Sequence, residues 1–130
     1  ERADAMIGWR AAKAVAGFDI GQTVVVQGAA IVAVEGMEGT DACVARAAAL
    51  ARTQGREPSL VVVKVAKPKQ DFRFDLPVVG LDTLISFKAA GVKAIALEAG
   101  STLIFDRERF AINADAAGIA VAGFPPEGPQ

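Results

Sequence analysis

Short β-branched runs that alternate with alanine-rich helical segments constrain the fold of this chain most strongly. The runs 23–27 and 30–35 are separated by Gly28, which indicates a tight hairpin of antiparallel strands. The apolar run 60–65 follows only after the alanine-rich segment 40–53, which is typical of a helix. This alternation predicts an α/β fold in which a mixed β-sheet is flanked by helices.

The remaining segments continue the same pattern. Helices are expected at 3–16, 40–53, 81–90 and 106–116, and strands at 23–27, 30–35, 60–65, 93–98, 102–105 and 119–123. The order helix, hairpin, helix, strand therefore occurs twice, which suggests two similar halves of roughly 60 to 70 residues. Thr40 or Asp41 is expected to cap the second helix, and Asp106 the last one.

The length of 130 residues suits one domain, and 52% of the residues are hydrophobic. We expect the domain to occupy 1–124 and the Pro/Gly-rich tail 125–130 to be loose. No apolar run approaches the ~20 residues that a membrane-spanning helix needs. The chain opens at Glu1 without a methionine, so we expect a boundary inside a longer protein.

The absence of histidine removes several kinds of active site, including Ser-His-Asp and Cys-His mechanisms and histidine metal centres. Cys43 is the only cysteine, so no intrachain disulfide can form and a reducing compartment is indicated. Without a histidine to activate it, Cys43 is expected to be a buried thiol. The net charge of −1 argues against a general attraction to nucleic acid. Chemistry in this chain must therefore use carboxylates, lysines, arginines or a hard metal ion.

A short charged segment, 64–75, follows the apolar run 60–63. Its side chains could neutralise phosphate, hold a divalent cation or position a water molecule for attack on phosphorus. They are the cations Lys64, Lys67, Lys69 and Arg73 and the carboxylates Asp71 and Asp75. This composition is typical of phosphate handling. A solvated charged connection would have a similar composition and is the alternative interpretation.

The segment 34–41 is a second candidate site, because two glycines allow the backbone to turn just before a helix begins. A helix N-terminus offers free amides to a phosphate, and Glu35, Glu38 and Asp41 are plausible oxygen ligands for a magnesium-like ion. Helix capping and a solvated turn are the alternative. Glu98 likewise closes an apolar run, so Glu35, Lys64 and Glu98 would be neighbours if their strands are adjacent.

The segments 34–41, 64–77 and 97–100 together resemble the signature segments of the bacterial UDP-2,3-diacylglucosamine pyrophosphatase LpxI family. The resemblance runs from the opening helix to Gly123 and is to the C-terminal domain of that family, so the N-terminal domain is expected to be missing from this chain. It implies a magnesium-dependent (or manganese-dependent) hydrolase of lipid A biosynthesis. The substrate would be UDP-2,3-diacylglucosamine, and the products UMP and 2,3-diacylglucosamine 1-phosphate (lipid X).

The resemblance also implies roles for individual residues. The expected catalytic residues are Asp71, Asp75, Lys67 and Lys69, the expected substrate-binding residues are Gly39, Thr40, Lys64 and Arg73, and the expected metal ligands are Asp71, Glu38 and Asp41. Asp71 is the first choice for holding the metal or positioning water, and Asp75 the second. The lysines and Arg73 would stabilise the charge that develops on phosphate oxygens.

In the two-domain family the acyl chains of the substrate lie between the domains, so the isolated domain is expected to show weak or no turnover. The whole enzyme is expected at the cytoplasmic face of the inner membrane as a peripheral protein. Two other interpretations remain open: a non-catalytic domain that binds a phosphorylated metabolite or forms oligomers, and a fragment of a nucleotide-sugar transferase. The oligomeric state, including a homo-oligomer, is also open.

Overall fold

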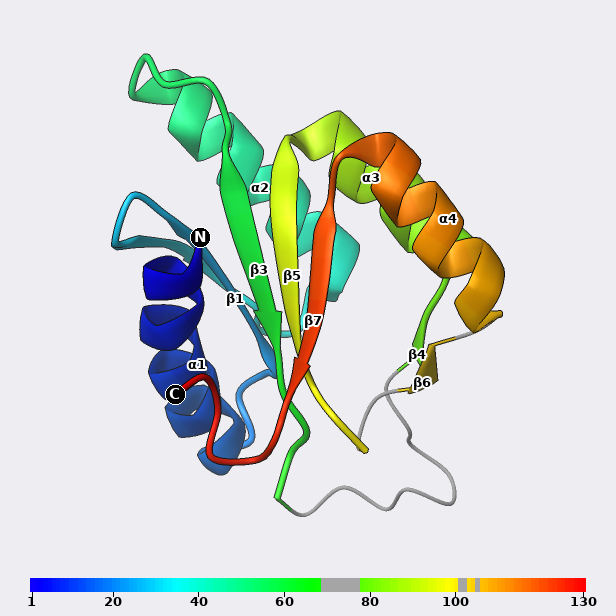
Figure 1. The fold of residues 1–130 in the computed structure, drawn as a ribbon. Helices are drawn as coiled ribbons and strands as arrows, with labels where there is room; N and C mark the ends of the chain where they lie inside the picture. Colours follow the sequence, from blue (N-terminus) through cyan, green and yellow to red (C-terminus); the bar gives the residue numbers. More distant parts are fainter. Residues whose placement is uncertain (69–77, 101–102, 105) are drawn as a thin grey trace.

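The computed structural model describes residues 1–68, 78–100, 103–104 and 106–130 (Figure 1). Its helices are α1 (Arg2–Gly17), α2 (Thr40–Thr53), α3 (Leu81–Ala90) and α4 (Arg107–Ala117). Its strands are β1 (Thr23–Gln27), β2 (Ala30–Val34), β3 (Leu60–Lys64), β4 (Val78–Val79), β5 (Val92–Glu98), β6 (Leu103–Ile104) and β7 (Ala120–Phe124). These bounds agree closely with the predicted elements, except that β4 was not predicted.

A five-stranded sheet with the order β2-β1-β3-β5-β7 forms the centre of the molecule. Strand β1 is antiparallel to both β2 and β3, whereas β3, β5 and β7 are mutually parallel. The prediction of an α/β fold with a mixed sheet flanked by helices is confirmed.

Helices cover both faces of the sheet, as Figure 1 shows. On one face α1 packs against a core that includes Val24 and Val63, and on the other face α2, α3 and α4 pack against a core that includes Val25 and Val62. Because both faces of the central strands are buried, β1 and β3 read as continuous valine runs rather than as an alternation of apolar and polar residues. Each fully buried valine contributes about 1.5–3 kcal/mol through the hydrophobic effect.

The second predicted hairpin, between 93–98 and 102–105, is wrong. Strand β5 is hydrogen-bonded to β3 on one edge and to β7 on the other, so neither edge of β5 is left for β6. Strand β6 pairs instead with β4, in a separate parallel two-stranded sheet. The two halves of the chain therefore differ in topology, although their elements follow a similar order.

Two further features of the chain bear on the sequence expectations. Cys43 on α2 is fully buried and unpaired, and burial raises the pKa of its thiol to about 11, so the expectation of a buried thiol is confirmed.

The tail 125–130, which the sequence predicted to be loose, contacts the first helix. The Pro126 carbonyl accepts a hydrogen bond from the indole nitrogen of Trp9 at 3.3 Å, and Gly128 is buried.

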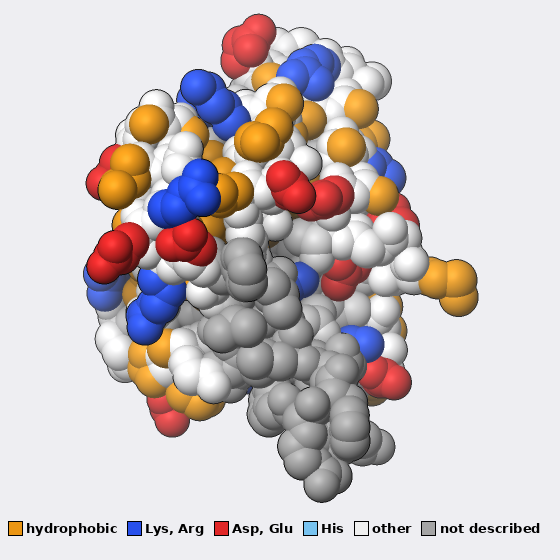
Figure 2. All heavy atoms as spheres, turned by 90° about the vertical axis from the view of Figure 1, so that its right-hand side faces the viewer, with side chains coloured by type: hydrophobic (Ala, Val, Ile, Leu, Met, Phe, Trp, Pro, Cys, Tyr) orange, Lys and Arg blue, Asp and Glu red, His pale blue; other side chains and the backbone are white. Residues whose placement is uncertain are grey.

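Within the described ranges, no helix combines the length and the apolar character needed to cross a membrane. Figure 2 shows one face of the molecule, on which the described Lys and Arg side chains alternate with Asp and Glu side chains and with apolar patches. The described part of this face therefore presents mixed charge rather than a continuous basic surface.

Candidate functional site

The carboxyl ends of β2, β3 and β5 lie at one edge of the sheet. Strands β2 and β3 are both antiparallel to β1, so they run in the same direction as each other and as β5. Glu35, Lys64 and Glu98 stand at these three strand ends and are therefore brought to the same edge. The expected adjacency holds for β3 and β5 but not for β2, which β1 separates from β3. This edge is the expected place for a ligand in an open α/β sheet.

The pleat of the strands divides these residues between the two faces of the sheet. Glu35 and Lys64 both reach Thr40 at the start of α2, on the face that α2 covers. Glu98 points to the opposite face, where it forms an ion pair with Lys13 of α1 and accepts a hydrogen bond from the Ala66 amide at 3.1 Å. Although the ends of β3 and β5 are adjacent in the sheet, only Glu35 and Lys64 of the three residues share a site.

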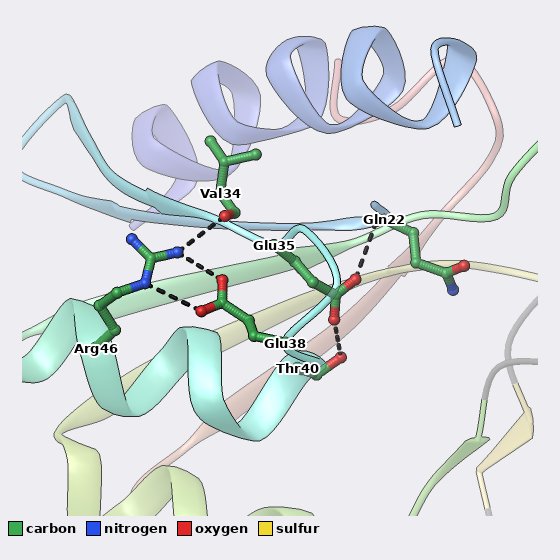
Figure 3. Close-up of polar contacts among 6 residues, drawn as sticks. All are labelled: Gln22, Val34, Glu35, Glu38, Thr40 and Arg46. Carbon is green, nitrogen blue, oxygen red and sulfur yellow. Dashed lines mark hydrogen bonds and ion pairs between the residues drawn. The ribbon is translucent and has the colours of Figure 1, made fainter. Parts of the chain in front are cut away.

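Hydrogen bonds connect Glu35 to this site in a chain (Figure 3). The backbone N–H of Gln22 donates to Oε1 of Glu35 at 3.1 Å, and the hydroxyl of Thr40 donates to Oε2 at 2.8 Å. The ammonium of Lys64 then donates to Oγ1 of Thr40 at 2.7 Å. Gly21 makes this approach of the loop before β1 possible, because a Cβ at that position would lie 2.0 Å from the Glu35 carbonyl oxygen.

A pocket of about 350 Å³ opens beside this chain. It is lined by Glu38, Gly39, Thr40, Asp41, Ala42, Lys64, Val79 and Thr83. The pocket thus combines the first residues of α2, the end of β3 and contributions from β4 and α3. A cation and a helix N-terminus that meet in one pocket provide the two groups that most often bind phosphate.

The start of α2 differs from the capping prediction. Gly39 is the N-cap residue, with φ 90°, and among the described residues no side chain caps the helix. The Thr40 hydroxyl is engaged with Glu35 instead, and Asp41 lies within the first turn. The prediction that Thr40 or Asp41 caps α2 is therefore wrong, whereas Asp106 does cap α4 through the Arg109 amide. The uncapped start of α2 leaves its first amides to other acceptors.

The ammonium of Lys64 is partly buried and lies near the charges of Glu35 and Asp41. Desolvation by burial lowers the pKa of its ammonium from the ordinary value, while the charges of Glu35 and Asp41 act in the opposite direction. Glu35 is itself buried, with 6% of its surface exposed. A partly desolvated cation interacts more strongly with an anionic ligand than a lysine in open solvent does.

Two carboxylates line the pocket and could contribute to a metal site. Glu38 forms a two-point ion pair with Arg46, with contacts of 2.6 and 3.2 Å, and Arg46 also donates to the Val34 carbonyl (Figure 3). These contacts hold the pKa of Glu38 below its ordinary value and fix its side chain. Asp41 is exposed at the pocket wall. Within the described ranges no cluster of three or more potential ligands occurs, so this pair would need further oxygen ligands to hold Mg²⁺.

The structure gathers part of the predicted site. Gly39, Thr40, Lys64, Glu38 and Asp41 all line the same pocket. Lys67 lies just beyond β3, with its Nζ 3.2 Å from Oδ1 of Asp19. The remaining predicted site residues lie outside the described residues: Lys69, Asp71, Arg73 and Asp75.

Several residues of this region were not among the predicted site residues, and those of them that line the pocket are Ala42, Val79 and Thr83. Thr83 reaches the pocket from α3, and no signal in the sequence links that helix to 39–41. Arg46 lies on α2 and forms an ion pair with Glu38, which belongs to the loop before that helix.

Glu35 was expected as an acid at a strand end and as a plausible ligand of a magnesium-like ion. It does not line the pocket, and both of its oxygens accept hydrogen bonds from the protein, so it differs from Glu38 and Asp41. Its connection to Lys64 through Thr40 depends on the order of the strands in the sheet.

Comparison with known proteins identifies relatives over nearly the whole chain. Residues 1–122 match the family model of the LpxI C-terminal domain. The chain is also 41% identical over 119 residues to the UDP-2,3-diacylglucosamine pyrophosphatase LpxI of Caulobacter vibrioides. That alignment covers 89% of this chain and 42% of the relative, so the chain spans less than half the length of this curated relative.

Proposed function

The chain belongs to the family of LpxI C-terminal domains, and on that basis we propose that it is part of an enzyme that hydrolyses UDP-2,3-diacylglucosamine. The pyrophosphate bond would be cleaved to give UMP and 2,3-diacylglucosamine 1-phosphate, in the biosynthesis of lipid A. The substrate assignment follows the name of the relative, which is a UDP-2,3-diacylglucosamine pyrophosphatase.

One structural observation supports a phosphate-handling role most directly: Lys64 and the uncapped N-terminus of α2 line the same pocket. A pyrophosphate carries several anionic oxygens, and cleavage increases the charge on the leaving phosphate. The Lys64 ammonium and the amides that begin at Gly39 are groups that stabilise such charge. Lys67, Lys69 and Arg73 are proposed to add further positive charge.

We propose that Mg²⁺, or Mn²⁺, is bound by Asp71 together with Glu38 and Asp41. The oxygen ligands of Glu38 and Asp41 line one pocket and suit a hard cation, and substrate phosphate oxygens would complete the coordination. When bound, the ion would polarise the phosphoryl oxygens and lower the pKa of a water molecule. Asp71, with Asp75 as the second choice, is proposed to orient the attacking water.

The whole protein is proposed to contain an N-terminal domain that encloses the acyl chains against this domain. The chain covers 42% of its Caulobacter relative, which leaves length for such a domain in that protein. Because the substrate has two acyl chains, we propose a peripheral location at the cytoplasmic face of the inner membrane. This chain alone is then expected to bind phosphate ligands but to turn over the substrate weakly or not at all.

The test is UMP release from UDP-2,3-diacylglucosamine by a full-length protein that carries this chain, with and without Mg²⁺. The variants are Asp71→Ala and, as a matched control, Asp115→Ala, which removes an exposed carboxylate of α4 that does not line the pocket. Metal-dependent UMP release by the unmodified protein and the control, with loss in Asp71→Ala, would support the proposal. Circular dichroism would establish that each variant is folded.

Other outcomes would favour the remaining candidates. No UMP release from a folded full-length protein that still binds UMP would favour a non-catalytic phosphate-binding domain. Release of UMP only after an acceptor is added would favour a nucleotide-sugar transferase. Unfolding of Asp71→Ala would assign Asp71 a structural role and leave the catalytic assignment to Asp75.

A further inference from the structure

Glu35 is a buried carboxylate whose two oxygens are both occupied by donors. The backbone N–H of Gln22 donates to Oε1, and the Thr40 hydroxyl donates to Oε2. Only 6% of the Glu35 surface is exposed, and the residue does not line the pocket. A buried charge is costly unless it is fully hydrogen-bonded, so the position of Glu35 calls for an explanation beyond packing.

The hydrogen atoms of this network can be assigned from the chemistry of its members. A hydroxyl has a single proton, and the carboxylate of Glu35 is only an acceptor, so Thr40 must direct its proton toward Glu35. The Thr40 oxygen can then only accept from its other neighbours. These are the Lys64 ammonium at 2.7 Å and the hydroxyl of the fully buried Thr23 at 3.3 Å.

From this arrangement we propose that Glu35 is a positioning residue, which orients the Thr40 hydroxyl and through it holds the Lys64 ammonium at the wall of the pocket. The role is indirect, because Glu35 reaches Lys64 through Thr40. An ammonium has several N–H groups, so one hydrogen bond to Thr40 leaves it able to donate to an anion as well. The orientation of Lys64 is thus set before a ligand arrives.

Replacement of Glu35 by glutamine tests this role with almost no change in volume. The glutamine carbonyl can accept from Gln22 or from Thr40, but its NH₂ group then faces the other donor. The backbone N–H of Gln22 can only donate, so the orientation with the glutamine carbonyl toward Gln22 is favoured. The Thr40 oxygen then accepts from the NH₂ group, and the Thr40 proton loses its acceptor at position 35. Thr40→Val removes the link outright, and Thr40→Ser restores the hydroxyl.

Glu98 provides a matched control. It is buried to a similar degree, with 3% exposed, and stands at the end of another strand of the same sheet, β5, but it binds Lys13 and Ala66 on the other face. Glu98→Gln therefore makes the same chemical change at the same edge of the sheet without touching Thr40 or Lys64. A general effect of losing a buried charge would appear in both glutamine variants.

The primary readout is the side-chain ammonium signal of Lys64 in ¹H–¹⁵N NMR spectra of this chain, assigned by its disappearance in Lys64→Arg. We expect the signal to be shifted or lost in Glu35→Gln and Thr40→Val, and to be retained in Thr40→Ser and Glu98→Gln. An unchanged Lys64 signal in folded Glu35→Gln would overturn the proposal. If Glu35→Gln does not fold, an unchanged signal in Thr40→Val would overturn it equally.

The kinetic readout rests on the proposed function. In the full-length protein, UMP release is expected to show a fall in kcat/KM of roughly tenfold or more in Glu35→Gln, with Glu98→Gln close to the unmodified protein. Thr40→Ser is expected to recover most of what Thr40→Val loses. If the unmodified protein releases no UMP, the proposed function fails, whereas the NMR comparison still decides whether Glu35 positions Lys64.

Discussion

Two buried carboxylates at one edge of the sheet, Glu35 and Glu98, point to opposite faces of the sheet and meet different partners. Glu35 and Glu98 both end an apolar strand, and both accept one hydrogen bond from a backbone amide. The second oxygen of Glu35 binds a residue of the pocket, Thr40, while the second oxygen of Glu98 binds Lys13 on a covering helix. The comparison teaches that an acid at a strand end acquires its role from the face of the sheet that its side chain meets.

The largest expected effect on turnover comes from a change at Lys64, on the face of the sheet that Glu35 occupies. Lys64→Met would remove the cation from the pocket, and UMP release by the full-length protein is expected to fall roughly 10²-fold or more. Stability should change little, because the partly buried ammonium carries a desolvation cost that methionine does not. Near-normal turnover in a folded Lys64→Met protein would show that the pocket does not handle the reacting phosphate.

Gly21→Ala would disturb the site around Glu35 by displacing the backbone. The added Cβ would lie 2.0 Å from the Glu35 carbonyl oxygen, so the loop before β1 must move away. We expect a loss of about 3 kcal/mol in the free energy of unfolding, measured with urea, together with a changed Lys64 ammonium signal. A matched Gly17→Ala variant, whose Cβ would meet nothing within 4 Å, should leave both unchanged. Equal stability of the two variants would contradict the close approach.

Lys13→Met tests the Glu98 side. Glu98 would lose its ion-pair partner while staying buried, and the free energy of unfolding is expected to fall by about 2 kcal/mol. Because Lys13 is itself partly exposed, water would compensate for part of the loss. Urea unfolding measures the change, and UMP release should stay near normal. A large loss of turnover with intact stability would place the Glu98 side in the active site and break the comparison.

The smallest expected effect concerns Arg46 and Glu38 at the rim of the pocket. The Arg46 guanidinium holds the pKa of Glu38 below its ordinary value of 4.5, so their contact adds stability above that value and is lost as pH falls through the lowered pKa. Arg46→Met should bring the pKa of Glu38 back toward 4.5, measured by NMR of the side-chain carboxyl carbon. Since the pair is exposed, stability should hardly change, and an unmoved pKa would contradict the contact.

The sequence predicted most of the secondary structure, because the local patterns are strong. The first hairpin, the helices and the apolar strands follow from β-branched runs, glycine turns and helical spacing within short windows. The second hairpin failed because both edges of β5 are taken by strands distant in sequence. The capping of α2 failed for a similar reason, since the Thr40 hydroxyl donates to Glu35 and accepts from Lys64 of β3 instead of binding an amide of α2.

The sequence predicted which residue types the candidate site contains, but only in part which residues lie together in space. Gly39, Thr40, Glu38 and Asp41 are close in sequence, so their common position follows from a single loop and helix start. Lys64 joins them because β3 ends at the same edge as β2. The contribution of Thr83 depends on how α3 packs beside that edge, which no local pattern encodes.

The sequence by itself determined the alternation of elements, the absence of histidine chemistry and the membership of a family, because these depend on residue identity and short-range spacing. Only the tertiary structure decided which face of the sheet each strand-end acid occupies. That choice depends on strand order and on the alternation of side chains across the sheet, where one residue of register changes the face. Glu35 meets the pocket and Glu98 meets α1 for that reason.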